Sequence, residues 1–194
     1  ISGVSANLEL QNVSSFSNPI NWTANGTLLL SSGNTTLTGN LTSTASLARI
    51  NVSAGNTVNV ASNINMTNYT FVKDGEGTLL VSSSTGNQSI GTLNVSGGML
   101  ELNSTNLIIS ANTHQISANS VLKYDKFNSS NARGTYNNSG AIQLNPSNTT
   151  FSQFYGNITG TGSVEIMGSV LTQFNYSGNY TGSTTVRQGS SAAM

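Results

Sequence analysis

Charged side chains are scarce in this chain of 194 residues. Six Lys and Arg residues balance six Asp and Glu residues, so the formal net charge is zero, and charged residues make up 6% of the chain. An ordinary soluble protein has about 25%. Binding to nucleic acid requires clustered Lys and Arg that neutralise phosphates, and a polybasic membrane patch requires the same residues. The composition therefore argues against both kinds of partner.

Cysteine is absent, which excludes disulfide bonds, thiol chemistry and a cysteine-ligated zinc site. Long apolar runs are absent too, because the longest, such as residues 28–30 and 107–109, are far shorter than the roughly 20 residues of a membrane-spanning helix. The chain begins at Ile1 without a basic and apolar signal segment. We expect a single domain, residues 1–194, that is an excised part of a longer or processed protein.

Proline occurs only twice, and apolar residues alternate with polar ones along most of the chain. Asn, Ser, Thr and Gly fill about half of the sequence, but disorder usually combines low hydrophobicity with high net charge and abundant Pro. Alternation places one set of side chains in a core and the other in solvent. The pattern predicts short β-strands, of which the clearest are residues 7–10, 57–60, 92–95, 99–102 and 163–166.

Clusters of Gly, Asn and Ser separate the predicted strands. Gly and Asn tolerate a positive φ, so we expect turns at residues 31–34, 54–56, 96–98, 136–140 and 177–179. No window of eleven or more residues has a convincing helical period, and Ala, Glu and Lys are too scarce to support long helices. We predict an all-β fold, which leaves a sandwich, a barrel or a solenoid.

An internal repeat distinguishes among these three folds. The segment Gly75-Glu76-Gly77-Thr78-Leu79-Leu80-Val81 has a counterpart in residues 160–166, because both read Gly-x-Gly-(Thr/Ser)-apolar-x-β-branched. We predict that residues 91–97 and 182–189 also correspond, with a spacing difference of about six residues taken up by a loop. Persistent strands joined by variable loops indicate stacked coils of roughly 20–25 residues each.

The repeated segments resemble the autotransporter-associated β-strand repeat. In that repeat a Gly-x-Gly-Thr-Leu-x-Leu strand leads to an Asn-Tyr-Thr-Gly turn and then to a Thr-Thr-Val strand that ends in Gly. Residues 178–186 are similar to the second half of the repeat, and residues 85–91 match its turn more loosely. The resemblance covers residues 73–102 and 156–190, about a third of the chain.

The resemblance implies a right-handed parallel β-helix, that is, a single-stranded β-solenoid, from the passenger of a bacterial type V secreted protein. It implies a place on the bacterial cell surface or outer membrane, or secretion, with membrane contact only through a barrel outside this chain. The expected function is adhesion to host cells or service as a rigid stalk. The expected partners are a host cell-surface receptor, a glycan or a matrix protein, with self-association as a further option.

Carboxylates are the first candidates for enzymatic chemistry, since some β-helices cleave carbohydrates. Alternation places Glu9, Glu101 and Glu165 on the solvated face. Nothing in the sequence enforces the separation of roughly 5–10 Å that a catalytic carboxylate pair needs. Asp74 and Glu76 lie in a Gly-rich turn, where acidic side chains usually accept hydrogen bonds from the local backbone.

His114 is the only histidine, so we expect a surface or core residue, because a triad or a metal site would need further partners. The calcium-binding nonapeptide and a phosphate-binding loop that ends in Lys-Ser/Thr are missing from the sequence. We therefore predict no catalytic, cofactor-binding or metal-binding residues, no cofactor and no enzymatic activity. Binding residues stay unassigned.

Asn-x-Ser/Thr, the acceptor motif for N-glycosylation, occurs about seventeen times. The reversed pattern, which has no such meaning, occurs about thirteen times. Alternation accounts for both, because an inward Val or Leu is flanked by outward Asn, Ser and Thr. Surface composition is the favoured interpretation, and glycosylation is the alternative.

Aromatic residues are scattered, with a local concentration at residues 151–155. Exposed aromatic side chains could stack on sugar rings or anchor a partner, whereas Phe is more often buried. We favour core packing for most of them. Exposed and adjacent Tyr176 and Tyr180 would instead indicate a recognition site.

Two other functions stay open at this stage. A glycosylated extracellular filament or envelope subunit, joined by strand exchange, would share the composition and the low charge. A polysaccharide-acting enzyme on the same fold would need an acidic or basic cluster along a groove.

Overall fold

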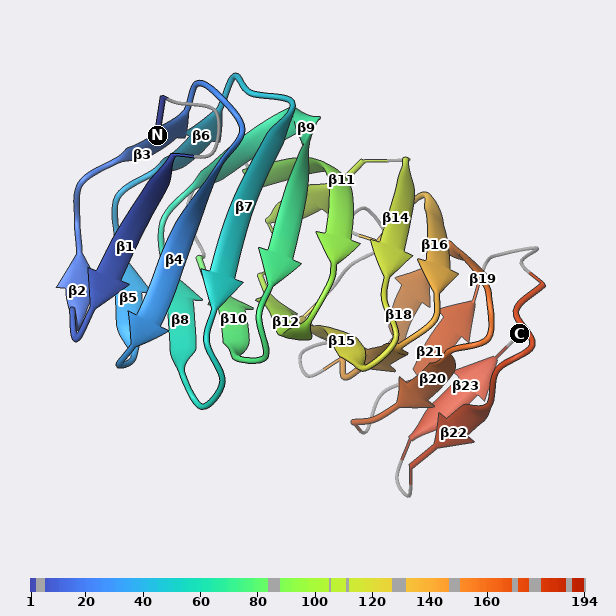
Figure 1. Ribbon diagram of the computed structural model, residues 1–194. Helices are drawn as coiled ribbons and strands as arrows, with labels where there is room; N and C mark the ends of the chain where they lie inside the picture. Colours follow the sequence, from blue (N-terminus) through green and yellow to red (C-terminus); the bar gives the residue numbers. More distant parts are fainter. Residues whose placement is uncertain are drawn as a thin grey trace.

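Parallel strands wind around one long axis in the computed structural model of the protein (Figure 1). The structure describes residues 1–2, 6–83, 88–104, 106–110, 112–126, 132–146, 151–168, 171–174, 179–187 and 190–193. Within these residues every strand pairing is parallel and no helix occurs. The all-β prediction and the prediction of a parallel β-solenoid are both confirmed.

Two long sheets form two faces of the solenoid. The first sheet runs through β1 (Asn7–Gln11), β4 (Gly26–Ser32), β7 (Leu47–Val52), β9 (Ile64–Asp74), β11 (Gln88–Val95), β14 (Thr113–Ile116), β16 (Thr135–Asn138) and β19 (Asn157–Thr159). The second sheet contains β2 (Ser15–Phe16), β5 (Thr35–Leu37), β8 (Thr57–Val60), β10 (Thr78–Val81), β12 (Gly98–Asn103), β15 (Ser120–Lys126), β17 (Ala141–Leu144), β20 (Ser163–Ile166) and β22 (Thr184–Val186).

A third face closes each coil. Its strands are β3 (Ile20–Trp22), β6 (Leu41–Ser43), β13 (Leu107–Ile109), β18 (Phe151–Phe154), β21 (Leu171–Phe174) and β23 (Ser191–Ala193). The long strands β9 and β11 join this face to the first sheet, since their N-terminal parts pair with β6 and β13 and their C-terminal parts with β7 and β14. Residues 64–67 and 88–90 therefore belong to the third face.

The coil length is nearly constant along the axis. Leu8 pairs with Leu28, twenty residues later, whereas Leu37 pairs with Val60, twenty-three residues later. Other pairings range from 19 residues, between Gln88 and Leu107, to 24 residues, between Asn65 and Ser89, so all but the shortest spacing lie within the predicted 20–25 residues. Because each strand lies beside its counterpart in the preceding coil, the side chains at equivalent positions form ladders parallel to the axis.

Apolar ladders fill the interior of the solenoid. In the second sheet one inward ladder consists of Val58, Leu79, Leu100, Leu122, Ile142 and Val164, and every member is buried. The predicted strands all carry such residues: Val58 and Val60 are buried in β8, while Thr57 and Asn59 point outward. Hydrophobic burial and backbone pairing between coils therefore stabilise the same arrangement.

The corner between the first and second sheets has one left-handed residue in most coils. The residues with positive φ at this corner are Asn12, Gly33, Gly55, Gly75, Gly98, Asn119 and Gly160. Gly and Asn are the residues that adopt this conformation at low cost. The predicted role of the Gly and Asn clusters is therefore confirmed at this corner.

Two predictions about the chain trace are wrong. Residues 136–138, expected in a turn, belong to β16, where Tyr136 is buried between its ladder neighbours His114 and Ile158. Residues 91–97 and 182–189 are not equivalent, because β11 lies in the first sheet and β22 in the second. The extra spacing between them therefore moves the strand to another face. The turn expected at residues 177–179 lies mostly outside the described residues.

The leucine pair at 79 and 80 tests the inward and outward assignment with one residue type. Leu79 is fully buried in β10, whereas Leu80 points outward. We expect Leu79→Ala to lower the free energy of unfolding by about 2–5 kcal/mol. Leu80→Ala should lower it by less than about 1 kcal/mol. Urea unfolding monitored by circular dichroism measures both, and equal losses would contradict the assignment.

Candidate functional site at the Lys73 corner

A lysine lies inside the solenoid at the end of β9. Lys73 occupies an inward ladder of the first sheet, between Ile50 of the preceding coil and Val95 of the next, and it is fully buried. A buried ammonium group is unfavourable unless hydrogen bonds satisfy it. The hydrogen-bond partners of its Nζ atom therefore determine whether the fold can accommodate a lysine at this position.

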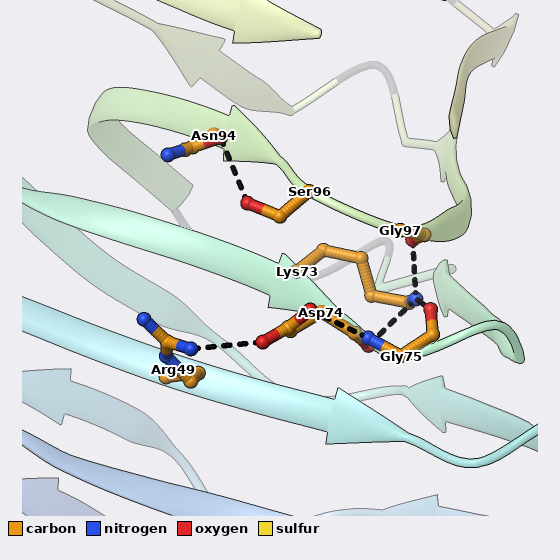
Figure 2. Close-up of polar contacts among 7 residues, drawn as sticks. All are labelled: Arg49, Lys73, Asp74, Gly75, Asn94, Ser96 and Gly97. Carbon is orange, nitrogen blue, oxygen red and sulfur yellow. Dashed lines mark hydrogen bonds and ion pairs between the residues drawn. The ribbon is translucent and has the colours of Figure 1, made fainter. Parts of the chain in front are cut away.

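Three backbone carbonyl groups surround the ammonium group (Figure 2). Lys73 Nζ donates to the oxygens of Asp74 at 2.9 Å, Gly75 at 2.8 Å and Gly97 at 2.9 Å. Gly97 belongs to the corner of the following coil, so one side chain links two successive corners. An ammonium group has three donors, and all three are used here.

Asp74 organises the outer side of the same corner. Its Oδ2 accepts from Arg49 Nη1 at 2.8 Å, and its Oδ1 accepts from the Gly75 backbone N–H at 2.9 Å. The prediction that the turn acid bonds its local backbone is confirmed. Figure 2 shows that Arg49 reaches this carboxylate from the neighbouring coil. Because both side chains are partly exposed, the ion pair adds little stability by itself.

Burial lowers the pKa of Lys73 to about 8, and the nearby Asp74 carboxylate only partly offsets this effect. The sequence contains a signal for this burial. Lys73 is two residues from Phe71, which is buried, and residues two apart in a strand share a face.

A shallow depression of about 490 Å³ covers this corner. Its lining comes from three consecutive corners, residues 74–76, 96–98 and 118–119. Asp74 and Glu76 are the acidic residues in it, and no group of three His, Cys, Asp or Glu side chains suited to a metal occurs among the described residues. The chemistry that the geometry supports here is attachment of one coil to the next.

The other carboxylates that the sequence singled out have partners on the outer faces. Glu101 pairs with Lys123 at 3.2 Å, Glu165 pairs with Arg187, and Glu9 accepts from Gln11 at 2.7 Å. Glu101 and Glu165 share one outward ladder, separated by three coil steps. At about 4.8 Å per step they are about 14 Å apart, beyond the range of a catalytic pair. The absence of enzymatic activity stays a prediction.

His114 is a core residue, which was one of the two expected alternatives. Its Nδ1 accepts from the Leu93 backbone N–H at 3.1 Å, and its Nε2 lies 3.0 Å and 3.1 Å from the carbonyl oxygens of Ser110 and Arg133. Carbonyl groups only accept, so Nε2 carries the proton and the ring is neutral. Burial lowers the pKa of this imidazole, although the two carbonyl groups act in the opposite direction.

Most described aromatic side chains pack in the core. Tyr136 stacks on His114 with ring centroids 4.7 Å apart and shares a hydroxyl hydrogen bond of 2.8 Å with Tyr124. The fully or nearly fully buried aromatic residues are Trp22, Phe71, Tyr124, Tyr136, Phe154 and Phe174.

Tyr155 does not pack in the core. It is the aromatic residue among the large hydrophobic residues that are exposed, with 41% of its surface accessible. Tyr180 is partly buried against the core and bonds Thr184 through their hydroxyl groups. Tyr176 lies outside the described residues. The condition set for a Tyr176–Tyr180 recognition site is therefore not met by the described part of the chain.

The glycosylation motifs follow the strand alternation. The middle residues Leu41, Val52, Met66, Val95 and Ile158 of five such motifs are all buried. Their flanking Asn, Ser and Thr residues then point outward, as the compositional interpretation requires. Glycosylation itself stays an alternative.

Comparisons with protein-family models, with curated proteins and with solved structures find no match to this chain. Among the described residues there is no helix with the length and hydrophobicity to cross a membrane. The fold and the corner geometry therefore carry the functional argument.

Replacement of Lys73 tests the corner. We expect Lys73→Met to lower the free energy of unfolding by about 1–3 kcal/mol at pH 7, because three carbonyl groups lose their donor. Lys123→Met, which removes an outward ammonium group, should change it by less than about 1 kcal/mol.

The pH dependence gives an independent readout of the same residue. The folded pKa of about 8 lies below the ordinary 10.5, so the unfolded chain binds more protons between these values and stability from this group rises with pH there. The stability difference between wild type and Lys73→Met should grow between pH 8 and 10.5. A difference that stays constant over this range would contradict the buried ammonium group.

His114 permits a direct pKa measurement because no other histidine is present. We expect its NMR titration midpoint to lie below the ordinary 6.5, since the ring is buried. Its contribution to stability is then complete above pH 6.5 and is lost as pH falls toward the folded pKa. His114→Phe should remove this loss, and a midpoint at or above 6.5 would contradict the buried neutral ring.

Proposed function

We propose that this chain is a rigid β-helical segment of a surface-displayed or secreted bacterial passenger, and that it presents its outer faces for adhesion to host cells. The observation that carries this proposal is the unbroken stack of coils. The second sheet continues through nine strands from β2 to β22 without a change of direction. Eight steps of about 4.8 Å give a rod about 38 Å long.

The coil interfaces support the role of a stalk. Each coil contacts its neighbours through in-register backbone pairing and apolar ladders, so stability is nearly a sum of nearest-neighbour interfaces. The Lys73 ammonium group adds a polar link between two corners. An elongated body held together in this way keeps surface groups at fixed spacing along its length.

The outer faces support adhesion more than turnover. Outward carboxylates such as Glu101 and Glu165 are paired with cations of neighbouring coils, which leaves them poorly placed as a free acid and base. The depression at the Lys73 corner is shallow and lacks a metal-binding group among the described residues. Outer faces rich in polar side chains suit contact with an extended partner.

Adhesion can be measured with beads that carry the purified chain. We expect saturable attachment to human epithelial cells or to a matrix-coated surface, and competition by the free chain, because the proposed contacts are specific. Beads coated with serum albumin provide the control. Attachment no greater than that of albumin beads on every cell and matrix surface would contradict the adhesive part of the proposal.

A further inference from the structure

The described strands of the third face carry no charged residue. None of its described strands, β3, β6, β13, β18, β21 and β23 with residues 64–67 and 88–90, contains Lys, Arg, Asp or Glu. The charged pairs lie elsewhere: Arg49–Asp74 is on the first sheet, and Lys123–Glu101 and Arg187–Glu165 belong to the second. One cation lies beside these strands, because Arg133 is exposed next to Ala132, whose carbonyl oxygen accepts from the Tyr155 backbone N–H at 3.2 Å.

Two glutamines and one tyrosine form a cluster at the C-terminal end of this face, near β18 and β21 (Figure 1). Gln153 of β18 is in register with Gln173 of β21, so their positions are about 4.8 Å apart. Tyr155 follows directly after β18, and 41% of its surface is exposed. We call Gln153, Tyr155 and Gln173 the Gln–Tyr patch.

Hydrogen bonds fix the orientation of the patch. The Tyr155 hydroxyl donates to Gln153 Oε1 at 2.8 Å, and Gln153 Nε2 donates to Gln173 Oε1 at 3.2 Å. The chain of donors therefore runs from Tyr155 to Gln173, and successive hydrogen bonds of this kind polarise one another. It ends at the Gln173 amide nitrogen, whose two N–H groups have no acceptor among the residues that the structure describes.

This arrangement combines the two elements of sugar recognition. The exposed ring of Tyr155 offers an apolar surface with a polar tip, against which the C–H face of a pyranose can pack. The adjacent amide groups offer donors and acceptors for hydroxyl groups. Three side chains form too small a surface for a stable protein interface, which takes roughly 800 Å² per partner.

We infer that the Gln–Tyr patch binds a neutral glycan. The inference rests on the proposed adhesive function and specifies its partner class and contact residues. The three residues of the patch carry no charge, so the patch itself offers no ion pair to a carboxylate or sulfate group. Tyr155 supplies the stacking surface, and Gln173 supplies the oriented donors.

Binding of the full chain to immobilised dextran, mannan and galactan tests the site, with carboxymethyl-dextran as the anionic comparison. We expect binding to at least one neutral polysaccharide, and a loss of affinity of about tenfold or more in Tyr155→Ala, as for a truncated aromatic anchor. Gln173→Ala should also weaken binding. Tyr155→Phe should weaken it less, because the ring remains and only the hydroxyl is lost.

Val186→Ala is the matched control, because Val186 is similarly exposed, at 47%, but lies on the second sheet. It should leave binding unchanged, and thermal unfolding should show that all variants fold. Binding to none of the neutral polysaccharides, binding only to carboxymethyl-dextran, or equal binding by wild type and Tyr155→Ala would each overturn the site.

The bead assay separates this inference from the proposed function. Saturable bead attachment by the wild-type chain, without binding to any of the neutral polysaccharides, overturns the patch and leaves adhesion in place. Polysaccharide binding that Tyr155→Ala abolishes, without any attachment to cells or matrix, supports the patch and contradicts host-cell adhesion.

Discussion

The structure depends on backbone hydrogen bonding between equivalent strands of successive coils. A strand such as β10 cannot satisfy its own N–H and C=O groups, so β8 and β12 on either side must satisfy them. The same stacking brings Val58, Leu79 and Leu100 into one ladder and removes them from water. Stacking one coil on the next thus provides both backbone pairing and hydrophobic burial. This explains why a strongly polar composition still gives an ordered fold.

Buried polar residues are accepted where corners offer backbone partners. Lys73 donates to three carbonyl groups, and Asn138, which lies further along the same ladder, donates to the Ser163 oxygen of the next coil at 2.9 Å. His114 similarly bonds the backbone on both sides of its ring. In each case the interior side chain connects segments about one coil apart. These hydrogen bonds therefore hold successive coils together, as the apolar ladders also do. The rigidity needed by a stalk and the fixed spacing needed by a binding face have the same origin.

The sequence predicted the strands well, because alternation directly encodes the inward and outward sides of a strand, as in residues 57–60 and 163–166. It could not assign strands to faces, since all three faces share the same alternation, and residues 91–97 were therefore paired with the wrong segment. The spacing of two residues from Phe71 is a signal for the burial of Lys73, but its hydrogen bond to Gly97 and the packing of Tyr136 on His114 join residues about one coil apart. Those contacts required the coil stacking. The Gln–Tyr patch was signalled only by the aromatic residues at 151–155; the in-register partner Gln173 required the coil stacking.

Spin-label distances along one outward ladder test coil stacking most directly, and the cysteine-free chain allows site-specific labels. Thr36, Gln143 and Thr185 belong to one ladder of the second sheet, with five steps between the first two and seven between the first and last. At about 4.8 Å per step, the backbone separations should be about 24 Å and about 34 Å, apart from the length of the label linkers. A Thr36–Thr185 distance equal to or shorter than the Thr36–Gln143 distance, as in a sandwich or a closed barrel, would contradict the solenoid.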